Sequence, residues 1–285
     1  MKCLGLSVLR ALLYFASMMY RVGLTAVAFL LLVQSAVWAQ HWTQINHDKS
    51  VSEKTALLIM NGFGGSKSGC KAQMEFWGNQ GVDVFIPDVL LRKSLGASSA
   101  AMHEFMEEYA IAEYGDVKAI CYIAGAFLLH TELESHPLPN LSAIIYDRSP
   151  TQERAPKAVA WEMPFVGWLA MGPVLKDLAE ATWPEPPNAP GIRKGLAIEN
   201  RATNIMRILE ATARAMGPLD YDWRAIDPSA SDAFHVGLDH NMMYVRWDLL
   251  GEPYVYFFKN GRFPEGLPRQ PIFENPFDKS NPIPK

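Results

Sequence analysis

The chain has 285 residues, of which 49% are hydrophobic and 20% are charged, a composition typical of a globular protein that buries a core. Its formal net charge is −4, and the sequence contains no run of clustered Lys and Arg. Binding to nucleic acid needs such clusters to neutralise phosphates, so nucleic acid is excluded as an expected partner.

The N-terminal 39 residues differ from the rest of the chain. Val22–Ala39 carries no charge and follows Arg21, and Val37 and Ala39 provide the small residues of a cleavage site. This pattern predicts a signal peptide, or an uncleaved anchor because the run approaches the roughly 20 residues that cross a bilayer. We therefore expect residues 40–285 to form an exported domain, periplasmic or extracellular, that contacts a membrane only through this segment.

Two cysteines lie in the expected domain. Cys121 belongs to an apolar run typical of a buried strand, which favours a buried free thiol. An oxidising compartment also permits a disulfide between Cys70 and Cys121, so their pairing stays open.

The domain alternates short apolar runs with helical patterns. Thr55–Met60 is a continuous apolar run of strand length, which suits a strand buried on both faces of a parallel sheet. The expected strands cover residues 55–60, 82–88, 119–123, 142–146, 194–199 and 233–238, and the expected helices cover residues 72–78, 98–114, 127–134 and 203–216. This alternation predicts an α/β fold, with a mostly parallel central sheet and helices on both faces.

Three segments depart from the alternation. Residues 151–190 are rich in proline and predict a small helical cap inserted over the rim, whose tryptophans either line an apolar pocket or anchor the cap (Trp161, Trp168 and Trp183). Residues 254–263 contain Asn260-Gly261, which favours a hairpin. The proline-rich tail over residues 264–285 predicts an extended surface segment.

The stretch over residues 117–130 is central to any function. A short apolar run meets Ala124-Gly125-Ala126 and continues as an apolar run with longer side chains. This pattern predicts a buried strand that turns sharply into a helix. No Ser, Cys or Asp stands between Tyr122 and Leu129.

Three segments together resemble the α/β-hydrolase family. Residues 57–65 are similar to the strand and His-Gly loop of the oxyanion hole, with Asn61 where His is usual. Phe85-Ile86-Pro87-Asp88 resembles the end of the next strand, and residues 237–241 resemble the strand and loop that present the catalytic His.

The resemblance implies an esterase-like or lipase-like site. Backbone amides of Gly62, Phe63 and Gly64, with those of Gly125 or Ala126, would form the oxyanion hole or contact a ligand. His240 would be the general base, and Glu199 would be the acid that orients it, with Asp227 and Asp232 as competitors for the acid.

The sequence departs from the family at the nucleophile. The family places Ser between small residues at the turn, whereas Ala124 or Gly125 stands there in this chain, so this position is degenerate. Cys121 precedes the bend and is a poor substitute. Ser66 and Ser68 in the glycine loop are the remaining hydroxyl candidates.

Two functions are compatible with this pattern. In the first, the exported protein is catalytically degenerate and binds a small apolar or ester-like ligand under the cap. In the second, it is an active hydrolase of carboxylic esters or lipids that uses His240 with a non-standard nucleophile or an activated water. No cofactor is expected, and no metal, because no His, Cys or carboxylate cluster has ligand spacing along the chain. The sequence does not predict an oligomeric state.

Overall fold

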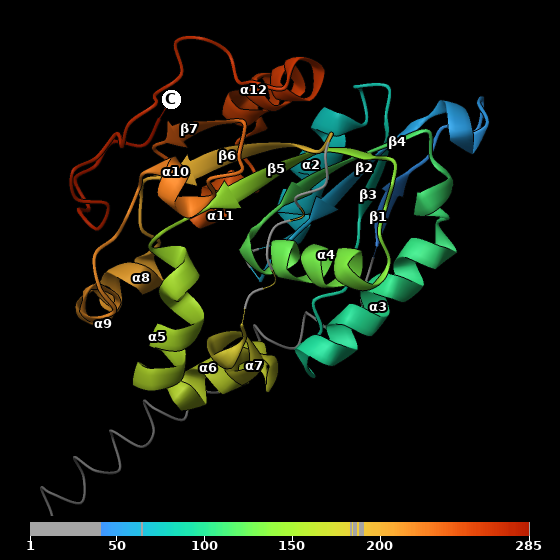
Figure 1. The fold of residues 1–285 in the computed structure, drawn as a ribbon. Coiled ribbons are helices and arrows are strands. Elements are labelled where there is room, and N and C mark those ends of the chain that lie inside the picture. Colours follow the sequence, from blue (N-terminus) through green and yellow to red (C-terminus); the bar gives the residue numbers. More distant parts are fainter. Residues whose placement is uncertain (1–40, 64, 183, 185–186, 188–190, 285) are drawn as a thin grey trace, which may run out of the picture. The chain divides into compact units, whose positions relative to one another are not determined.

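The structure of the chain, a computed structural model, describes residues 41–63, 65–182, 184, 187 and 191–284 (Figure 1). The expected signal segment falls outside these residues, and the chain from Gln40 onward forms one unit. No helix in the described residues is long and apolar enough to cross a membrane. Cys70 and Cys121 are both free thiols.

A seven-stranded sheet forms the centre of the described domain, with the order β1-β3-β2-β4-β5-β6-β7. The strands are β1 (Trp42–Gln44), β2 (Thr55–Met60), β3 (Asp83–Ile86), β4 (Asp116–Cys121), β5 (Leu141–Arg148), β6 (Arg193–Glu199) and β7 (Asp232–Val236). Only the pairing of β1 with β3 is antiparallel. The predicted α/β fold with a mostly parallel sheet is therefore confirmed.

Helices connect the parallel strands. In chain order they are α2 (Lys67–Trp77), α3 (Leu95–Glu108), α4 (Ile123–Ser135), α5 (Ala155–Glu162), α6 (Pro164–Met171), α7 (Val174–Glu180), α8 (Asn204–Ile208), α9 (Glu210–Ala215), α10 (Trp223–Ile226), α11 (His240–Met243) and α12 (Trp247–Asn260). Short 3-10 turns lie at Val51–Glu53, Ile111–Glu113 and Gln152–Arg154.

The two faces of the sheet carry separate apolar clusters. Leu58 of β2 belongs to the cluster that contains Phe105 of α3 and buried residues of α4. Its neighbour Leu57 belongs to the cluster that contains Trp77 of α2 and Trp247 of α12. Successive strand side chains point to opposite faces, so a sheet covered on both sides needs the continuous apolar run seen in β2.

Helices α5, α6 and α7 lie in the segment for which a cap was predicted. The loop before α3 holds them, because Arg92 O accepts a bond from Val174 N–H at 3.3 Å and Asp177 Oδ2 accepts one from Leu95 N–H at 2.9 Å. The large aromatic residues on α5 and α6 are exposed: Trp161 is 60% exposed, Phe165 is 70% exposed and Trp168 is 55% exposed. More than half of the surface of Trp161 and of Trp168 is therefore open to solvent, and Trp183 lies outside the described residues.

The expected hairpin over residues 254–263 is wrong. Most of these residues belong to α12, which ends at Gly261 in the left-handed conformation (φ 72°) with its N–H bonded to Phe257 O. An Asn-Gly pair suits both a type I′ turn and a helix C-terminus. Burial of one face of α12 against the sheet decides for the helix.

Two expected helices have different bounds. The helix predicted over residues 203–216 is divided at Leu209, whose backbone leaves the helical region (φ −95°, ψ 16°), into α8 and α9. The helix predicted over residues 98–114 begins earlier and ends at Glu108, because Ala110 adopts a left-handed conformation (φ 49°).

Candidate active site

The carboxyl edge of the parallel strands gathers polar groups from five segments. β2 leads into Gly62, and β4 leads into Tyr122. Asp147 is the penultimate residue of β5, Glu199 is the last residue of β6, and His240 follows β7. Ligands of open α/β sheets bind outside the carboxyl ends of the strands, so this edge is the first place to look for a site.

His240 contacts two buried carboxylates through one ring nitrogen. Its Nδ1 lies 2.5 Å from Glu199 Oε1 and 3.4 Å from Asp147 Oδ2. His240 is 6% exposed and the two acids are at most 1% exposed, so water screens these charges little. The structure thus brings together the predicted base and the predicted acid, in the arrangement that orients the histidine of a catalytic triad.

The loop before α11 fixes the position of His240. Asp239 caps this helix, and its carboxylate accepts bonds from the backbone N–H groups of Asn241 and Met242, both at 3.1 Å. An Asp at this position satisfies donors that the first turn of a helix leaves free. The sequence Asp239-His240-Asn241 therefore places the imidazole next to the end of β6.

The charges around His240 set its protonation. Burial alone lowers the pKa of the imidazole, but the charge of Glu199 and the hydrogen bonds to Asp147 and Glu199 outweigh it and raise the pKa to about 10. Burial and the charge of Asp147 raise the pKa of Glu199 well above its usual value, against the opposing effect of His240. Both shifts favour the protonated forms, of the His240 imidazole in one case and of the Glu199 carboxyl in the other.

The other ring nitrogen of His240 faces a tyrosine. The hydroxyl oxygen of Tyr244 lies 3.3 Å from His240 Nε2, and it accepts a hydrogen bond from Gly62 N–H at 3.2 Å. Tyr244 is completely buried. In a triad, Nε2 is the nitrogen that takes the proton of the nucleophile. In this chain, the group beside Nε2 is the phenol of Tyr244.

A second tyrosine occupies the turn between β4 and α4. Tyr122 has an extended backbone (φ −84°, ψ 157°), and its ring stacks on that of Tyr244 with centroids 4.0 Å apart and planes at 14°. Its hydroxyl accepts a bond from Gln73 Nε2 at 3.2 Å and donates to Met243 O at 3.1 Å. The stacked pair lies between the turn and His240.

Comparison with known proteins adds to this geometry. No protein-family model matches the sequence, and no curated protein matches it significantly. Among solved structures, a bromoperoxidase from Bacillus anthracis is similar over 77% of this chain and 95% of its own chain, with a TM-score of 0.51 and 10% identity. An α/β-hydrolase enzyme from a metagenome of lagoon sediments at Mar Chica, Morocco, has a TM-score of 0.45 and 15% identity, covering 76% of this chain and 98% of its own. Lipase BlEst2 from Bacillus licheniformis has a TM-score of 0.46 and 14% identity, covering 77% of this chain and 97% of its own.

The chain has the α/β-hydrolase fold. At these identities the likeness concerns the fold, and the function must be argued from the site.

The bend of the α/β-hydrolase elbow lies earlier than expected. The sequence placed it at Ala124 and Gly125, but both residues lie in the first turn of α4, and the bend is at Tyr122. The small residues serve packing, because a Cβ on Gly125 would lie 2.0 Å from Met60 O of β2. Helical bonding begins at the bend itself, since Ala126 N–H donates to Tyr122 O at 2.8 Å.

Tyr122 has none of the properties of an elbow nucleophile. A catalytic elbow holds its nucleophile in a strained turn, whereas Tyr122 is in the ordinary extended region. Burial, together with the charge of Asp147, raises the pKa of its phenol well above the usual value. Both hydrogen-bonding roles of this buried phenol are satisfied within the protein, by Gln73 and by Met243 O.

The glycine loop lies against the start of α4, as an oxyanion hole requires. A Cβ on Gly62 would lie 3.7 Å from Ala124 N. However, Gly62 N–H is bonded to Tyr244, and Ala126 N–H is bonded within α4. Phe63 is 37% exposed, and Gly64 lies outside the described residues.

The competing residues have other partners. Ser66 caps α2, because its hydroxyl oxygen accepts a hydrogen bond from Gly69 N–H at 3.1 Å. The same hydroxyl lies 2.9 Å from that of Ser68. These contacts do not involve His240. Asp227 pairs with Lys194, and Asp232 pairs with Arg269. Cys121 is completely buried, and burial raises the pKa of its thiol.

Sequence reasoning missed Asp147 and Tyr244. Asp147 lies near the carboxyl end of a predicted strand next to the elbow strand, a position that could have identified it. Tyr244 lies four residues after His240 and so falls on the same side of a helical turn. Only packing reveals that its ring stacks on Tyr122.

The three titratable groups are also close enough together to hold a metal ion. Ligand atoms of Asp147, Glu199 and His240 lie within 4.8 Å of one another. All three residues are buried, however, so this cluster has no exposed side at which an ion could keep a water ligand. The expectation of no metal at this site stays a prediction.

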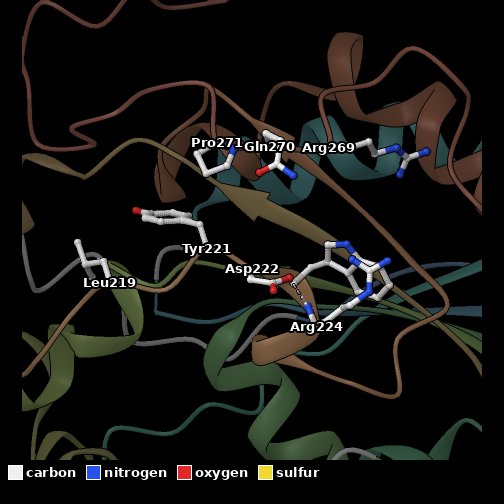
Figure 2. Close-up of a pocket in the computed structure, with 8 residues that line it drawn as sticks. Leu219, Tyr221, Asp222, Arg224, Arg269, Gln270 and Pro271 are labelled. Carbon is white, nitrogen blue, oxygen red and sulfur yellow. Dashed lines mark hydrogen bonds between the residues drawn. The ribbon is translucent and has the colours of Figure 1, made fainter.

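A pocket of about 450 Å³ lies outside this site, between the residues before α10 and the C-terminal tail (Figure 2). It is lined by Leu219, Tyr221, Asp222, Trp223, Arg224, Arg269, Gln270 and Pro271. Its charged groups have partners within the protein: Asp222 caps α10, Arg224 lies over the ring of Trp223, and Arg269 pairs with Asp232. The residues around His240 do not line it.

Proposed function

We propose that the chain is an exported α/β-hydrolase-fold protein that has lost ester hydrolysis and acts by binding a small apolar or ester-like molecule at its cap. The observation that carries the loss of hydrolysis is the stacked pair of Tyr122 and Tyr244. This pair stands where a nucleophile and a substrate would meet His240 Nε2.

Two groups that triad catalysis needs are missing in this proposal: a nucleophile and an unprotonated base. The turn after β4 offers no hydroxyl or thiol nucleophile, since the phenol of Tyr122 is buried and bonded. The carboxylates beside Nδ1 raise the pKa of His240 and so favour the protonated imidazole, whose Nε2 has no lone pair to accept a proton. Removing triad members leaves only a small residual rate.

Exposed aromatic side chains support a binding role for the cap. Trp161, Phe165 and Trp168 are each more than half exposed on α5 and α6, while Ala158 and Leu178 of the cap are buried. Soluble proteins rarely present large apolar side chains together unless something binds them. The flat, rigid rings suit an alkyl chain or an ester with a long acyl group.

A covalent probe tests the loss of hydrolysis. We expect the protein purified from the exported fraction to give no adduct with a fluorophosphonate and no turnover of acyl esters from two to sixteen carbons. Cooperative melting of the same sample shows that it is folded. A single adduct mapped by mass spectrometry would identify a nucleophile and overturn the proposal.

Tryptophan fluorescence tests the binding role. A non-hydrolysable ether analogue of a medium-chain ester should shift the emission to the blue and saturate. Trp168→Ser should weaken this binding by more than about tenfold, since stacking on aromatic rings supplies much of the energy of such contacts. Ile272→Ser, which removes an exposed apolar side chain of the tail, is the control. Equal binding by both variants would exclude the cap.

An active hydrolase is the second candidate. The contact of 2.5 Å between His240 and Glu199 favours it, because this contact is the base-orienting half of a triad. In this case His240 would act on water, or on the phenol of Tyr244. Turnover that is lost in His240→Gln and kept in Tyr244→Phe would indicate activated water. Turnover that is lost in both variants would indicate the phenol.

Export is proposed from the sequence of residues 1–39. The mature protein should begin at Gln40 if this segment is removed as a signal peptide. Intact mass of the protein from the exported fraction measures this directly. A full-length mass in the membrane fraction would indicate an anchor instead.

A further inference from the structure

A second cluster of titratable side chains lies at the far end of α4. His103 of α3 and His136 at the end of α4 both direct Nδ1 at one carboxylate oxygen, Glu132 Oε1, at 2.9 Å and 3.0 Å. The two imidazole rings stack with centroids 4.1 Å apart and planes at 22°. None of these residues belongs to the site around His240.

Helix geometry explains how the three residues meet. Glu132 and His136 are four residues apart, so they lie on the same side of α4. His103 comes from α3, which packs beside α4 (Figure 1). This cluster cannot be recognised from the sequence, because His103 is 29 residues from Glu132.

Burial makes the Glu132 carboxylate dependent on these two rings. Its side chain is 6% exposed, and in the described part of the chain it forms ion pairs with the two histidines and with no Lys or Arg. Buried charged groups are usually paired with an opposite charge or coordinate a metal ion, and both histidines present Nδ1 to this carboxylate oxygen.

A divalent cation suits this arrangement of two imidazole nitrogens around one carboxylate oxygen. It supplies two positive charges at one point and lets both imidazoles be neutral ligands. Tetrahedral zinc with bonds of roughly 2.0–2.1 Å places its ligand atoms about 3.3 Å apart. The observed distances of 2.9 Å and 3.0 Å between each Nδ1 and Oε1 are close to this value, and the partly exposed imidazole rings, which stack in this structure, would turn so that both Nδ1 lone pairs point at the ion.

The exposed side of the cluster leaves room for water. The side chains of His103 and His136 are 40% and 54% exposed, whereas Glu132 lies beneath them. Two imidazoles and one carboxylate form a donor set that zinc sites use with water as the fourth ligand. Imidazole also favours divalent transition metals over calcium and magnesium.

We propose that His103, Glu132 and His136 form a binding site for a divalent transition-metal ion of the zinc type. The ligand atoms are Nδ1 of each histidine and Oε1 of Glu132, whose distances to one another are within 4.8 Å. The ion would link α3 to the C-terminal end of α4. The N-terminal end of α4 follows Tyr122. The site goes beyond the proposed function and does not depend on it.

Zinc titration of the purified, tag-free protein tests this site. Calorimetry with ZnCl₂ should show saturable binding of a single equivalent and a higher melting temperature with zinc, because a ligand that binds only the folded state stabilises it. His103→Ala and His136→Ala should each weaken zinc binding by more than about tenfold. His47→Ala, in an exposed part of the chain, is the matched control.

The two histidine variants are expected to fold, because both side chains are partly exposed and their removal leaves no buried cavity. A loss of zinc binding in them would therefore report on the site itself. Glu199→Gln separates this site from the cluster around His240 and should leave zinc binding unchanged. Absence of saturable binding would overturn the proposal and leave a hydrogen-bonded cluster. Binding that survives in both His103→Ala and His136→Ala would also overturn it.

Discussion

His240 lies between two buried carboxylates and a buried phenol, and these neighbours decide what its ring can do. A catalytic base at neutral pH needs a pKa near 7. Here burial is outweighed by the charge of Glu199 and by hydrogen bonds to both acids, which raise the pKa to about 10. The same residues that would orient the base hold it in the acid form.

This protonation has a measurable effect on stability. The folded protein holds the His240 proton with a pKa of about 10, against 6.5 in the unfolded chain, so this contribution is full below pH 6.5 and is lost as the pH rises toward 10. The raised pKa of Glu199 acts in the same direction at lower pH. The melting temperature should therefore fall between pH 7 and pH 10.

Glu199→Gln should flatten this fall, because the amide keeps the shape of the side chain without its charge. Glu274→Gln, which alters an exposed carboxyl group of the tail, is the control and should melt like the parent protein. Identical pH profiles of Glu199→Gln and the parent would contradict the charge assignment.

Tyr244→Phe removes one hydroxyl that serves two partners. Gly62 N–H loses its acceptor and His240 Nε2 loses its contact, so we expect unfolding to need about 1–3 kcal/mol less free energy. Urea denaturation measures the change. Tyr256→Phe, in the partly exposed part of α12, should change stability by less than about 0.5 kcal/mol.

For single residues, the sequence predicts a place in the site when the residue stands at the carboxyl end of a predicted strand. His240 and Glu199 follow predicted strands, and the sheet brings them together. Tyr244 and Tyr122 could not be predicted in the same way, since their contact depends on how α11 packs against the turn after β4. The cluster around Glu132 likewise depends on the packing of two helices.

Among the elements, α4 shows why small residues follow the turn. The helix passes so close to β2 that a Cβ on Gly125 would lie 2.0 Å from Met60 O, a backbone atom that cannot move aside. The sequence Ala-Gly-Ala resembles the small residues around a catalytic elbow, but here it permits helix-to-strand packing. This explains why the bend was expected in the wrong place.

Gly125→Ala should therefore destabilise the protein by more than about 4 kcal/mol, or prevent folding. Gly96→Ala in α3 is the matched control, because a Cβ there meets nothing within 4 Å. It should raise the free energy of unfolding by about 0.5–1 kcal/mol, since alanine favours the helix. Urea denaturation compares the two. Similar effects of both substitutions would contradict the close approach of α4 to β2.

Element types followed from periodicity wherever the apolar pattern was unambiguous. The continuous apolar runs predicted six of the strands, but short β1 (Trp42–Gln44) contains no such run and was not predicted. The turn residues Asn260-Gly261 were ambiguous, and burial of α12 decided between hairpin and helix. Local signals cannot resolve such cases because the deciding contacts are distant in sequence.

Across the whole domain, the C-terminal tail covers the open edge of β7. His235 N–H donates to Pro268 O at 2.8 Å, and Ala202 N–H donates to Pro276 O at 2.9 Å. The described part of the tail contains no helix or strand, as its prolines predicted, and its Phe277 is buried in a cluster with Ala202, Met206 and Ala213. An uncovered edge strand is prone to pair with other chains.

A chain that stops after Gly266 should melt at a lower temperature and associate, as measured by light scattering at several concentrations. A chain that stops after Asn281 loses the bond from Arg246 to Pro284 O but keeps the bond from His235 to Pro268 O, so it should stay monodisperse like the full protein. A monodisperse short chain with unchanged melting would show that the tail does not protect the edge.

Both ends of the domain emerge on the same side of the sheet. Trp42, at the start of β1, pairs with Ile86 at the carboxyl end of β3, and Pro284 lies against Gly237, just beyond β7. The loops that carry Gly62 and His240 share this edge. A terminal tag used to immobilise the protein on a sensor chip would therefore turn these loops toward the support. Coupling through a cysteine introduced by Glu113→Cys, before β4 at the opposite edge, would leave them open to the solution.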